Sequence, residues 1–380
     1  MKNIVSLILL GVVAALVTVG VMVLASTSSI KGMDEQSDPY FFLAKQAKWL
    51  AIALLIGIAT ARFDYHHWRD HRLYSAMMIG TFILLLLVFV PGIGAEIKGS
   101  HRWLKLGPMT FQPSELAKLS AILCLSRYVV KTGWRMSMLK YSLGWPMLGI
   151  APLLLLILAE PDFGTTVLVG VITMSLLFAG GMKARYLAIA VSFFLVVILG
   201  LALISPVRSE RIWSFLNPEA HPKASYQLIQ SKVAFIRGEW DGVGLGNSMQ
   251  KQFYLPEAYT DFILPIIGEE LGLIASGGVL LGFAVFMLCG VYISYNAPDL
   301  YGRLVAFGIT VWITGQAIIN IAVVSGCAPT KGMALPFISY GGSSMVMLMA
   351  AVGVLINIAK HCSEGSDKHT VFIRDNVQDF

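Results

Sequence analysis

Asp261 is the residue whose type and position best suit acid–base chemistry. It is the last polar residue of segment 254–262, which leads into a long apolar run. Burial beside apolar walls raises the pKa of a carboxylate, which suits a general base that accepts a proton near neutral pH. The same place suits a helix cap, because Thr260 and Asp261 precede the run and Pro265 fits a first helical turn. Spacing alone leaves both interpretations open.

Basic and aromatic side chains gather in a second polar segment, 92–112. Arg102 and Trp103 are adjacent there, and they suit either a phosphate and sugar platform or a simple interfacial anchor. The apolar run that follows carries Glu115 and Lys118, three residues apart and therefore on one face of a helix. Lys118 is able to grip a phosphate while Glu115 orients it. The alternative is an ordinary ion pair with Lys118 extended outward to water.

A third segment combines Lys331 with a stretch of proline, glycine and serine that includes Ser343. Irregular backbone next to an apolar run is tolerated only where it avoids lipid, for example around a cavity. This segment therefore indicates a site. Two more carboxylates, Glu269 and Glu270, lie inside an apolar run. Structural pairing is the simplest interpretation for them, and a proton or metal role is the alternative.

Apolar runs long enough to cross a membrane must position these groups. The chain has 380 residues, of which 56% are hydrophobic and 13% charged, about half the charge content of a soluble protein. Only helices satisfy their own backbone groups in lipid, so we expect an all-α polytopic membrane protein with about ten transmembrane helices. The predicted spans are 4–25, 43–62, 73–92, 113–131, 142–159, 163–181, 185–205, 263–294, 303–326 and 336–359.

The loops predict how the chain lies in the membrane. Lys and Arg in the short loops favour both termini in the cytoplasm. Segment 206–262, between spans seven and eight, is then a large extracytoplasmic loop, on the same face as 92–112. Residues 1–360 form one transmembrane domain, and 361–380 form a flexible cytoplasmic tail. The net charge of +6 is explained by anionic lipid and these loops, so no nucleic-acid partner is expected.

Several enzyme classes have no support in the sequence. The chain contains no GxxxxGK[ST] loop, no HExxH and no GxSxG, which are typical of ATPases, zinc proteases and serine hydrolases. No cysteine or histidine spacing indicates a metal cage.

Five motifs, taken in order, resemble the SEDS family of polytopic peptidoglycan polymerases, which includes FtsW and RodA. They are GSHRWLKLGPMTFQPSELAKL, AEPDFGTT, GVGLGNSMQKQFYLPEAYTDF, IIGEELG and PTKGMALPFISYGGSS. The resemblance covers about 90–359. GNSMQK and the last motif look more like division-type FtsW than RodA, and sporulation-type SpoVE-like members share that pattern.

The resemblance implies polymerisation of lipid II into glycan strands at the outer face of the bacterial cytoplasmic membrane during cell division. It implies that Asp261 is the general base for the incoming sugar hydroxyl, with inversion at the donor carbon. Arg102, Lys118 and Lys331 would hold the pyrophosphate. The substrate-binding residues predicted in this way are Arg102, Trp103, Glu115, Lys118, Lys331 and Ser343.

The resemblance also implies a divalent cation, Mg²⁺ or Mn²⁺, with unknown ligands and no organic cofactor. It implies a class B penicillin-binding protein transpeptidase and other divisome proteins as partners, and a location at the division septum. We expect the transpeptidase to contact 206–262 and the two apolar runs that follow. A lipid II flippase and a division scaffold that activates a transpeptidase are the alternative functions. Tyr259 and Pro265 depart from the family, which often has histidine and a small residue there.

Overall fold

The computed structural model describes residues 2–97, 100–107 and 109–362, and its long helices form one bundle. The helices are α1 (Lys2–Gln36), α2 (Phe41–Arg62), α3 (His71–Leu87), α4 (Pro113–Thr132), α5 (Trp145–Ala159), α6 (Phe163–Ala179), α7 (Ala184–Ile204), α8 (Pro206–Leu216), α9 (Pro222–Gly238), α10 (Ile263–Asn296), α11 (Leu300–Ser325) and α12 (Gly342–His361). Short 3₁₀ and π turns add Tyr65–Arg69, Gly133–Ser137, Lys140–Gly144 and Gln250–Tyr254. The predicted tail falls mostly on 363–380, which lie outside the described residues.

The helical membrane fold expected from the sequence is confirmed. In the described part, seven helices are long and apolar enough to cross a membrane, and α3 and α6 are shorter apolar helices. Each of the ten predicted spans coincides with a helix, but the count of ten stays a prediction. The boundaries of α1 and α12 differ most from the prediction. The first helix continues to Gln36, and α12 begins at Gly342 rather than 336, because 326–341 has an irregular backbone.

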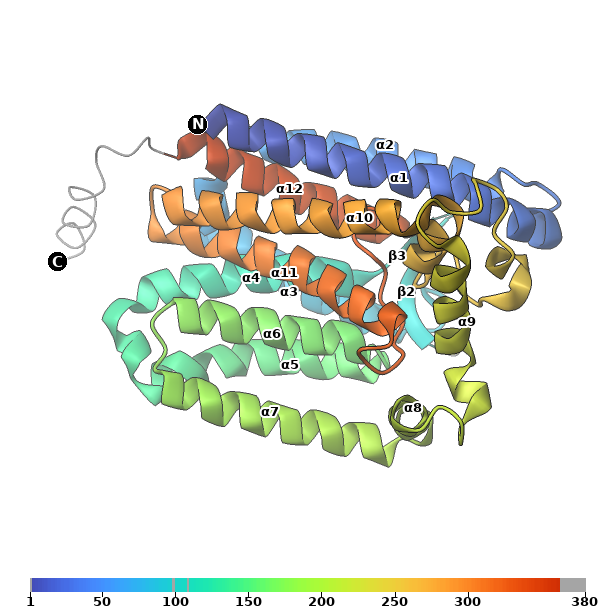
Figure 1. The fold of residues 1–380 in the computed structure, drawn as a ribbon. Coiled ribbons are helices and arrows are strands. Elements are labelled where there is room, and N and C mark those ends of the chain that lie inside the picture. Colours follow the sequence, from blue (N-terminus) through green and yellow to red (C-terminus); the bar gives the residue numbers. More distant parts are fainter. Residues whose placement is uncertain (1, 98–99, 108, 363–380) are drawn as a thin grey trace.

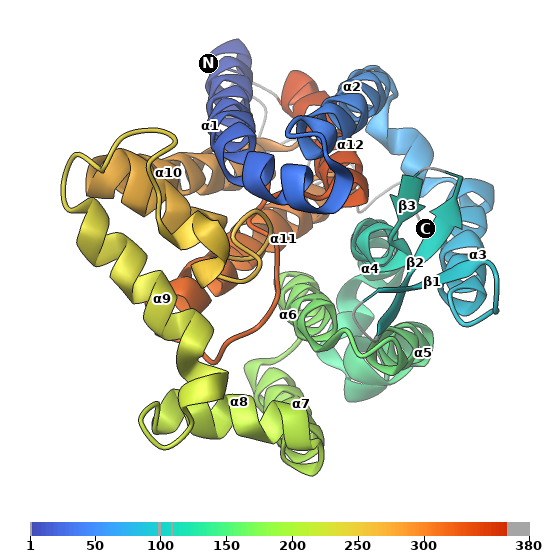
Figure 2. The ribbon, with the colours of Figure 1, turned by 90° about the vertical axis from the view of Figure 1, so that its right-hand side faces the viewer.

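Different secondary-structure elements lie at the two ends of the bundle. A small sheet and helices α8 and α9 lie at the right-hand end in Figure 1, and α1 begins and α12 ends at the left. The sheet was not anticipated in segment 92–112. Its strands β1 (Gly94–Ile97), β2 (Ser100–Leu106) and β3 (Met109–Phe111) are antiparallel in the order β1-β2-β3. Segment 326–341 runs between α9 and α6 at this end (Figure 2).

Helix α12 lies in the core of the bundle and packs against α2. A Cβ on Gly353 would lie 2.1 Å from the Thr60 hydroxyl, so only glycine permits this approach of the two helices. Small residues let membrane helices come this close. Asn357 accepts a hydrogen bond from Tyr65 N at 3.0 Å and donates one to Ala61 O at 3.1 Å. These contacts join α12 to the end of α2.

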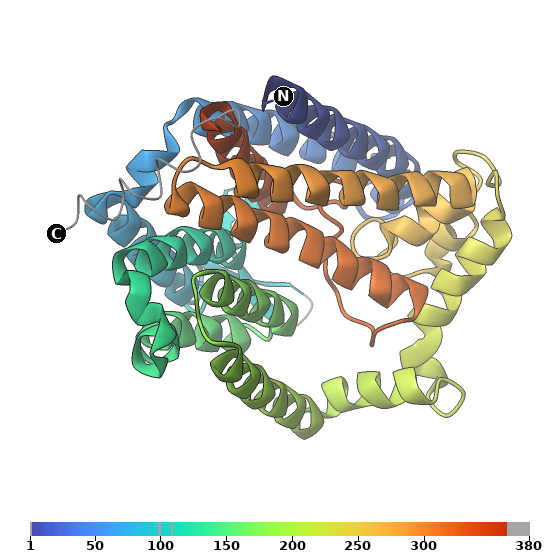
Figure 3. The same cartoon turned by 60° about the vertical axis from the view of Figure 1, so that its left-hand side comes forward.

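Helix α10 is interrupted at Gly272, whose φ of +78° is unfavourable for any residue with a Cβ. The segment after α9 fills the break. Val243 N donates to Glu269 O at 2.9 Å, and Leu273 N donates to Glu239 O at 2.9 Å. The long outer segment is therefore hydrogen-bonded into α10 rather than lying loosely over it. In Figure 3, α9 crosses the end of α10, while α7 stands apart from α10 and is joined to it through α8 and α9.

Candidate active site

Arg102 connects the sheet to the turn between α5 and α6. It projects from β2, where Trp103 pairs with Ala95. The guanidinium donates from Nε to Glu160 O at 3.1 Å and from Nη2 to Pro161 O at 2.7 Å. Strand β2 thus fixes a cation beside the start of α6, while Trp103 is half-buried next to it.

Lys331 lies on the other side of the start of α6. Its Nζ lies 4.3 Å from the centroid of the Phe163 ring, and the Arg208 guanidinium lies 5.2 Å from the same ring. A Cβ on Gly164 would be 2.6 Å from Lys331 Cε, so the lysine stem passes directly over this glycine. Segment 326–341 and α8 therefore bring two cations to one aromatic ring.

The charges around Lys331 interact strongly with one another. The pKa of Lys331 is lowered to about 7, chiefly by burial and also by three neighbouring cations, while Asp162 acts in the opposite direction. The three cations are Arg102, Arg208 and Arg211. Lysine loses its proton readily in such surroundings because a buried charge near like charges is unfavourable. We call Arg102, Arg208, Arg211 and Lys331 the cation cluster.

Asp261 lies against the same segment. A Cβ on Gly332, the residue after Lys331, would be 2.6 Å from Asp261 Oδ2, so the carboxylate packs directly on this glycine. The pKa of Arg211 is lowered, first by partial burial and then by Arg102, while Asp261 raises it. The predicted base and the cation cluster therefore belong to one site.

The backbone around Asp261 is held by side chains of the surrounding segments. Asn320 donates from Nδ2 to Asp261 O at 2.8 Å and to Met333 O at 2.6 Å. Ser339 donates to Thr260 O at 2.5 Å. Helix α10 begins at Ile263 with Phe262 at the N-cap position, one residue after Asp261. A helix-capping role for Asp261 stays an alternative prediction.

Lys118 is 1% exposed and joins α4 to α11. Its ammonium donates to Glu115 Oε1 at 2.8 Å and to Gln316 Oε1 at 3.0 Å, and lies 5.0 Å from the Trp312 ring. Gln316 in turn donates to Ala334 O at 2.9 Å. The predicted pair of Glu115 and Lys118 is present, but the lysine does not extend outward. Its contact with a pyrophosphate stays a prediction.

Ser343 lies in the first turn of α12 and accepts a hydrogen bond from Gln112 N at 3.3 Å. The Gln112 side chain donates to Asp162 Oδ2 at 3.2 Å. Asp162 also caps α6, accepting from Thr165 N at 3.1 Å and from its hydroxyl at 2.8 Å. Ser343 is thus connected through Gln112 to the carboxylate beside the cation cluster.

Glu160 is the group of the site with the most unusual environment. It is fully buried, and neither carboxylate oxygen has a hydrogen-bond partner among the described residues. Its pKa is raised to about 9, chiefly by burial and also by the neighbouring Asp162, while Arg102 acts in the opposite direction. Glu160 is therefore protonated and neutral at pH 7.

Glu269 and Glu270 hold the outer segment in place. Glu269 accepts from Ser248, from Met249 N at 3.0 Å and from Arg237 at 3.3 Å. Glu270 accepts from Lys251 Nζ at 2.9 Å and from Ser26 at 2.7 Å. These contacts confirm structural pairing, the simplest interpretation of these two carboxylates.

The described residues contain no group of three or more His, Cys, Asp or Glu side chains arranged to hold an ion. Mg²⁺ is more often bound through one or two carboxylates and the phosphates of a substrate than in an all-protein cage.

Asp261, Lys331 and Arg102 lie at one site. Glu115, Lys118 and Ser343 are connected to its neighbouring segments through Gln316 and Gln112. Sequence reasoning missed four groups: Glu160, Asp162, Arg208 and Arg211. Glu160 and Asp162 lie in the short break between the predicted spans 142–159 and 163–181. Arg208 and Arg211 are three residues apart in a polar helix, a pattern that is common on solvent-exposed helix faces. Nothing in the sequence therefore distinguished them as site residues.

Comparisons with known proteins agree with this architecture. Residues 6–364 match the family model FTSW_RODA_SPOVE, described as "Cell cycle protein". The chain is 41% identical over 357 residues to a "Probable peptidoglycan glycosyltransferase FtsW" of Legionella pneumophila, covering 92% of this chain and 89% of the relative. A protein of the same name from Geobacter metallireducens is 38% identical over 354 residues, with coverage of 93% and 94%.

Solved structures are similar over nearly the whole chain. A chain of a peptidoglycan synthase complex superposes with a TM-score of 0.75 at 25% identity, covering 94% of this chain and 98% of that one. The rod shape determining protein RodA of Thermus thermophilus gives a TM-score of 0.66 at 23% identity, with coverage of 94% and 97%, which supports the fold. The family match, the relatives and the bundle all agree: this chain is a multi-pass membrane protein that belongs to the FtsW/RodA/SpoVE family.

Proposed function

We propose that this chain is a division-type peptidoglycan glycosyltransferase that polymerises lipid II. The observation that carries the proposal is the position of Asp261 against Gly332, next to a cluster of four cations supplied by β2, α8 and segment 326–341. The relatives at 38–41% identity are named peptidoglycan glycosyltransferase FtsW, which supports the same activity.

The chemistry of the transfer fits these groups. A sugar hydroxyl of the acceptor attacks the anomeric carbon of the donor, and its proton passes to the Asp261 carboxylate. The bond from that carbon to the phosphate oxygen breaks, and the electron pair leaves with the pyrophosphate. Attack from the opposite face inverts the carbon. A pyrophosphate is a stable anion, so its departure depends on positive charge more than on a general acid.

The cation cluster supplies that charge. Arg102, Arg208, Arg211 and Lys331 would bind the pyrophosphate, with arginine suited to two-point contacts with phosphate oxygens. Lys331 is half-protonated near pH 7 in the free protein, and an anionic ligand restores its charge. Trp103 would pack against sugar or lipid. Glu115, Lys118 and Ser343 would support the site through Gln316 and Gln112.

A divalent cation, Mg²⁺ or Mn²⁺, would enter with the substrate and neutralise pyrophosphate oxygens. This fits the absence of a three-ligand group among the described residues. We further propose that the cation cluster and α8–α9 face the outside of the cytoplasmic membrane, with both termini in the cytoplasm, at the division septum. A class B penicillin-binding transpeptidase would contact 206–262, α10 and α11, with other divisome proteins around it.

The test is strand polymerisation by the purified chain with its transpeptidase partner, whose own active site is blocked. Lipid II and Mn²⁺ are supplied to wild type, Asp261→Asn and Asp241→Asn, a control at an exposed acid of the outer segment. Wild type and the control should produce glycan ladders, and Asp261→Asn should lose at least about 100-fold in rate. Ladders from Asp261→Asn would remove the aspartate from the mechanism. No ladders from any protein would favour a flippase or scaffold.

A further inference from the structure

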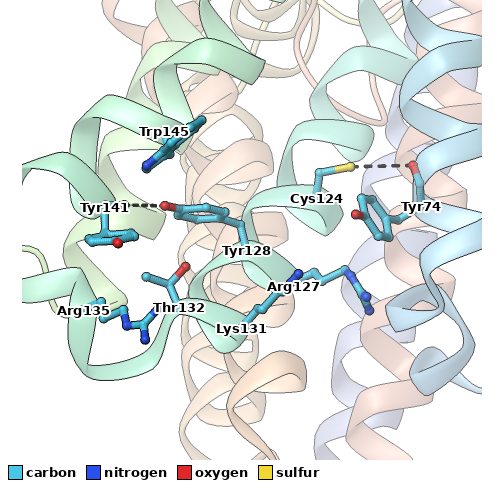
Figure 4. Close-up of a pocket in the computed structure, with 9 residues that line it drawn as sticks. All are labelled: Tyr74, Cys124, Arg127, Tyr128, Lys131, Thr132, Arg135, Tyr141 and Trp145. Carbon is cyan, nitrogen blue, oxygen red and sulfur yellow. Dashed lines mark hydrogen bonds between the residues drawn. The ribbon is translucent and has the colours of Figure 1, made fainter.

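A cavity of about 430 Å³ lies at the end of the bundle away from the sheet, between α3, the end of α4 and the start of α5. Figure 4 shows three cations in its lining. Arg127 and Lys131 are one turn apart on α4, and Arg135 follows in the next short turn. None of the lining residues is acidic. Within the described ranges, none of the three cations has a carboxylate within 4.0 Å.

Aromatic side chains contact two of these three cations. The Arg127 guanidinium lies 4.6 Å from the Tyr74 ring, and that of Arg135 lies 5.8 Å from the Tyr141 ring. Tyr128 donates to Tyr141 O at 2.7 Å, which joins α4 to the segment before α5 (Figure 4). The cavity is therefore a preformed pocket with a cationic wall and an aromatic wall, rather than a group of loose surface lysines.

The surroundings of the pocket place it where water meets lipid. Trp134 beside it is 73% exposed, and Trp145 on its rim is 48% exposed. Exposed tryptophans are typical of the headgroup level of a membrane. From Trp145, one face of α5 continues with Leu148 and Leu155, which are 67% and 64% exposed. A polar pocket thus opens onto an apolar stripe that runs toward the middle of the bundle.

We propose that this pocket binds the phosphodiester headgroup of an anionic phospholipid of the inner leaflet, with its acyl chains along α5. Arginine forks match phosphate oxygens, and basic pockets between membrane helices on the cytoplasmic side suit such headgroups. A soluble phosphate would use the cations but not the stripe of Trp145, Leu148 and Leu155. The proposal uses the orientation given above, but no residue of the proposed catalytic site.

The experiment is native mass spectrometry of the full chain, released from detergent with defined lipids. Phosphatidylglycerol is compared with zwitterionic phosphatidylethanolamine, for wild type and for the triple variant Arg127→Gln, Lys131→Gln and Arg135→Gln. Wild type should prefer phosphatidylglycerol by about 10-fold or more, and the triple variant should lose that preference. Soluble glycerol phosphate, added in excess, should not displace the lipid.

A matched control removes three positive charges at the same end without touching the pocket, through Arg72→Gln, Lys183→Gln and Arg185→Gln. It should keep the wild-type preference. An equal loss of the phosphatidylglycerol preference in the control would show a general charge effect and overturn the proposed pocket. Retention of that preference in the triple variant would also overturn it. Displacement by glycerol phosphate would indicate a soluble anion instead. If the triple variant does not fold, Arg135→Gln alone changes only the exposed turn and should still weaken the preference.

Discussion

Gly332→Ala offers a direct test of how closely Asp261 is positioned. The new Cβ would lie 2.6 Å from Asp261 Oδ2, and ordinary contact begins near 3.4 Å. The carboxylate must therefore move by about 0.8 Å, because the backbone of 333 and 261 is held by Asn320. No positive φ is required at this glycine, so the effect arises from the added methyl group and not from backbone strain.

The expected cost follows from the size of that shift. Displacing a reacting group by about 1 Å lowers the rate by about 100-fold, so we expect Gly332→Ala to lose between about 10-fold and 100-fold in kcat. Substrate affinity should change less, since the cations on β2 and α8 are not displaced. The overall fold should survive, because Gly332 lies outside the helices.

The assay is the rate of glycan-strand formation from lipid II, measured beside thermal unfolding of the same preparation. Gly341→Ala is the control in the same segment. Its Cβ would meet Ser344 Cβ at an ordinary 3.6 Å, and its φ of 177° suits any residue. The control should keep wild-type activity. If a folded Gly332→Ala protein had the kcat of wild type, the activity would not depend on this close placement of the Asp261 carboxylate, and the reasoning would be refuted.

Three further predictions concern ionisable groups. Lys118→Met or Glu115→Gln should each cost about 3–5 kcal/mol in the free energy of unfolding, because each leaves a buried charge unpaired. The double variant should recover most of this loss, and simple additivity would contradict the pairing. With lipid II, the KM of wild type should rise as the pH increases through about 7, where free Lys331 loses its charge, whereas Lys331→Arg should show a flat KM between pH 6 and 8.5. Identical pH profiles would remove Lys331 from pyrophosphate binding. Glu160 has a folded-state pKa of about 9 against an ordinary 4.5, so the folded state holds its proton more tightly and stability falls as the pH rises between these values. Glu160→Gln resembles the protonated acid. Its free energy of unfolding should therefore increase relative to that of wild type, by up to about 1.4 kcal/mol for each unit that the pH rises within this range. Unfolding is measured at pH 5 and 8. An equal gain at both pH values would contradict the assigned protonation.

Hydropathy predicted the helices well because long apolar runs in lipid permit only one backbone solution. Gln316 and Asn320, four residues apart on α11, donate hydrogen bonds to Ala334 O and Asp261 O, whereas Trp312 donates to Gln316 within the same helix. Asp261 was identified through its motif and its position before a span. The small sheet was missed, because its strands are short and lie in a segment recognised only as polar.

The rest of the site depends on contacts between segments that are far apart in the sequence, and the spacing of residues does not predict such contacts. Arg208 and Arg211 reach Lys331 only because α8 turns back toward segment 326–341. Glu160 and Asp162 differ in role although they are two residues apart, since Glu160 is buried with no hydrogen-bond partner among the described residues and Asp162 caps α6. Lys118 was expected to meet substrate or water, and packing against Trp312 and Gln316 encloses it instead.

The central position of α12 also constrains how the protein is made. The ribosome delivers α2 to the membrane well before α12, which follows directly after α11, so the face of α2 that packs against α12 must stay open during insertion. Until it is covered, the Thr60 hydroxyl and Ala61 O, which later face Gly353 and Asn357, are left toward lipid or toward the insertion machinery. A chain that stops before Gly342 would therefore lack the helix against which α2 packs, whatever the packing of its earlier helices.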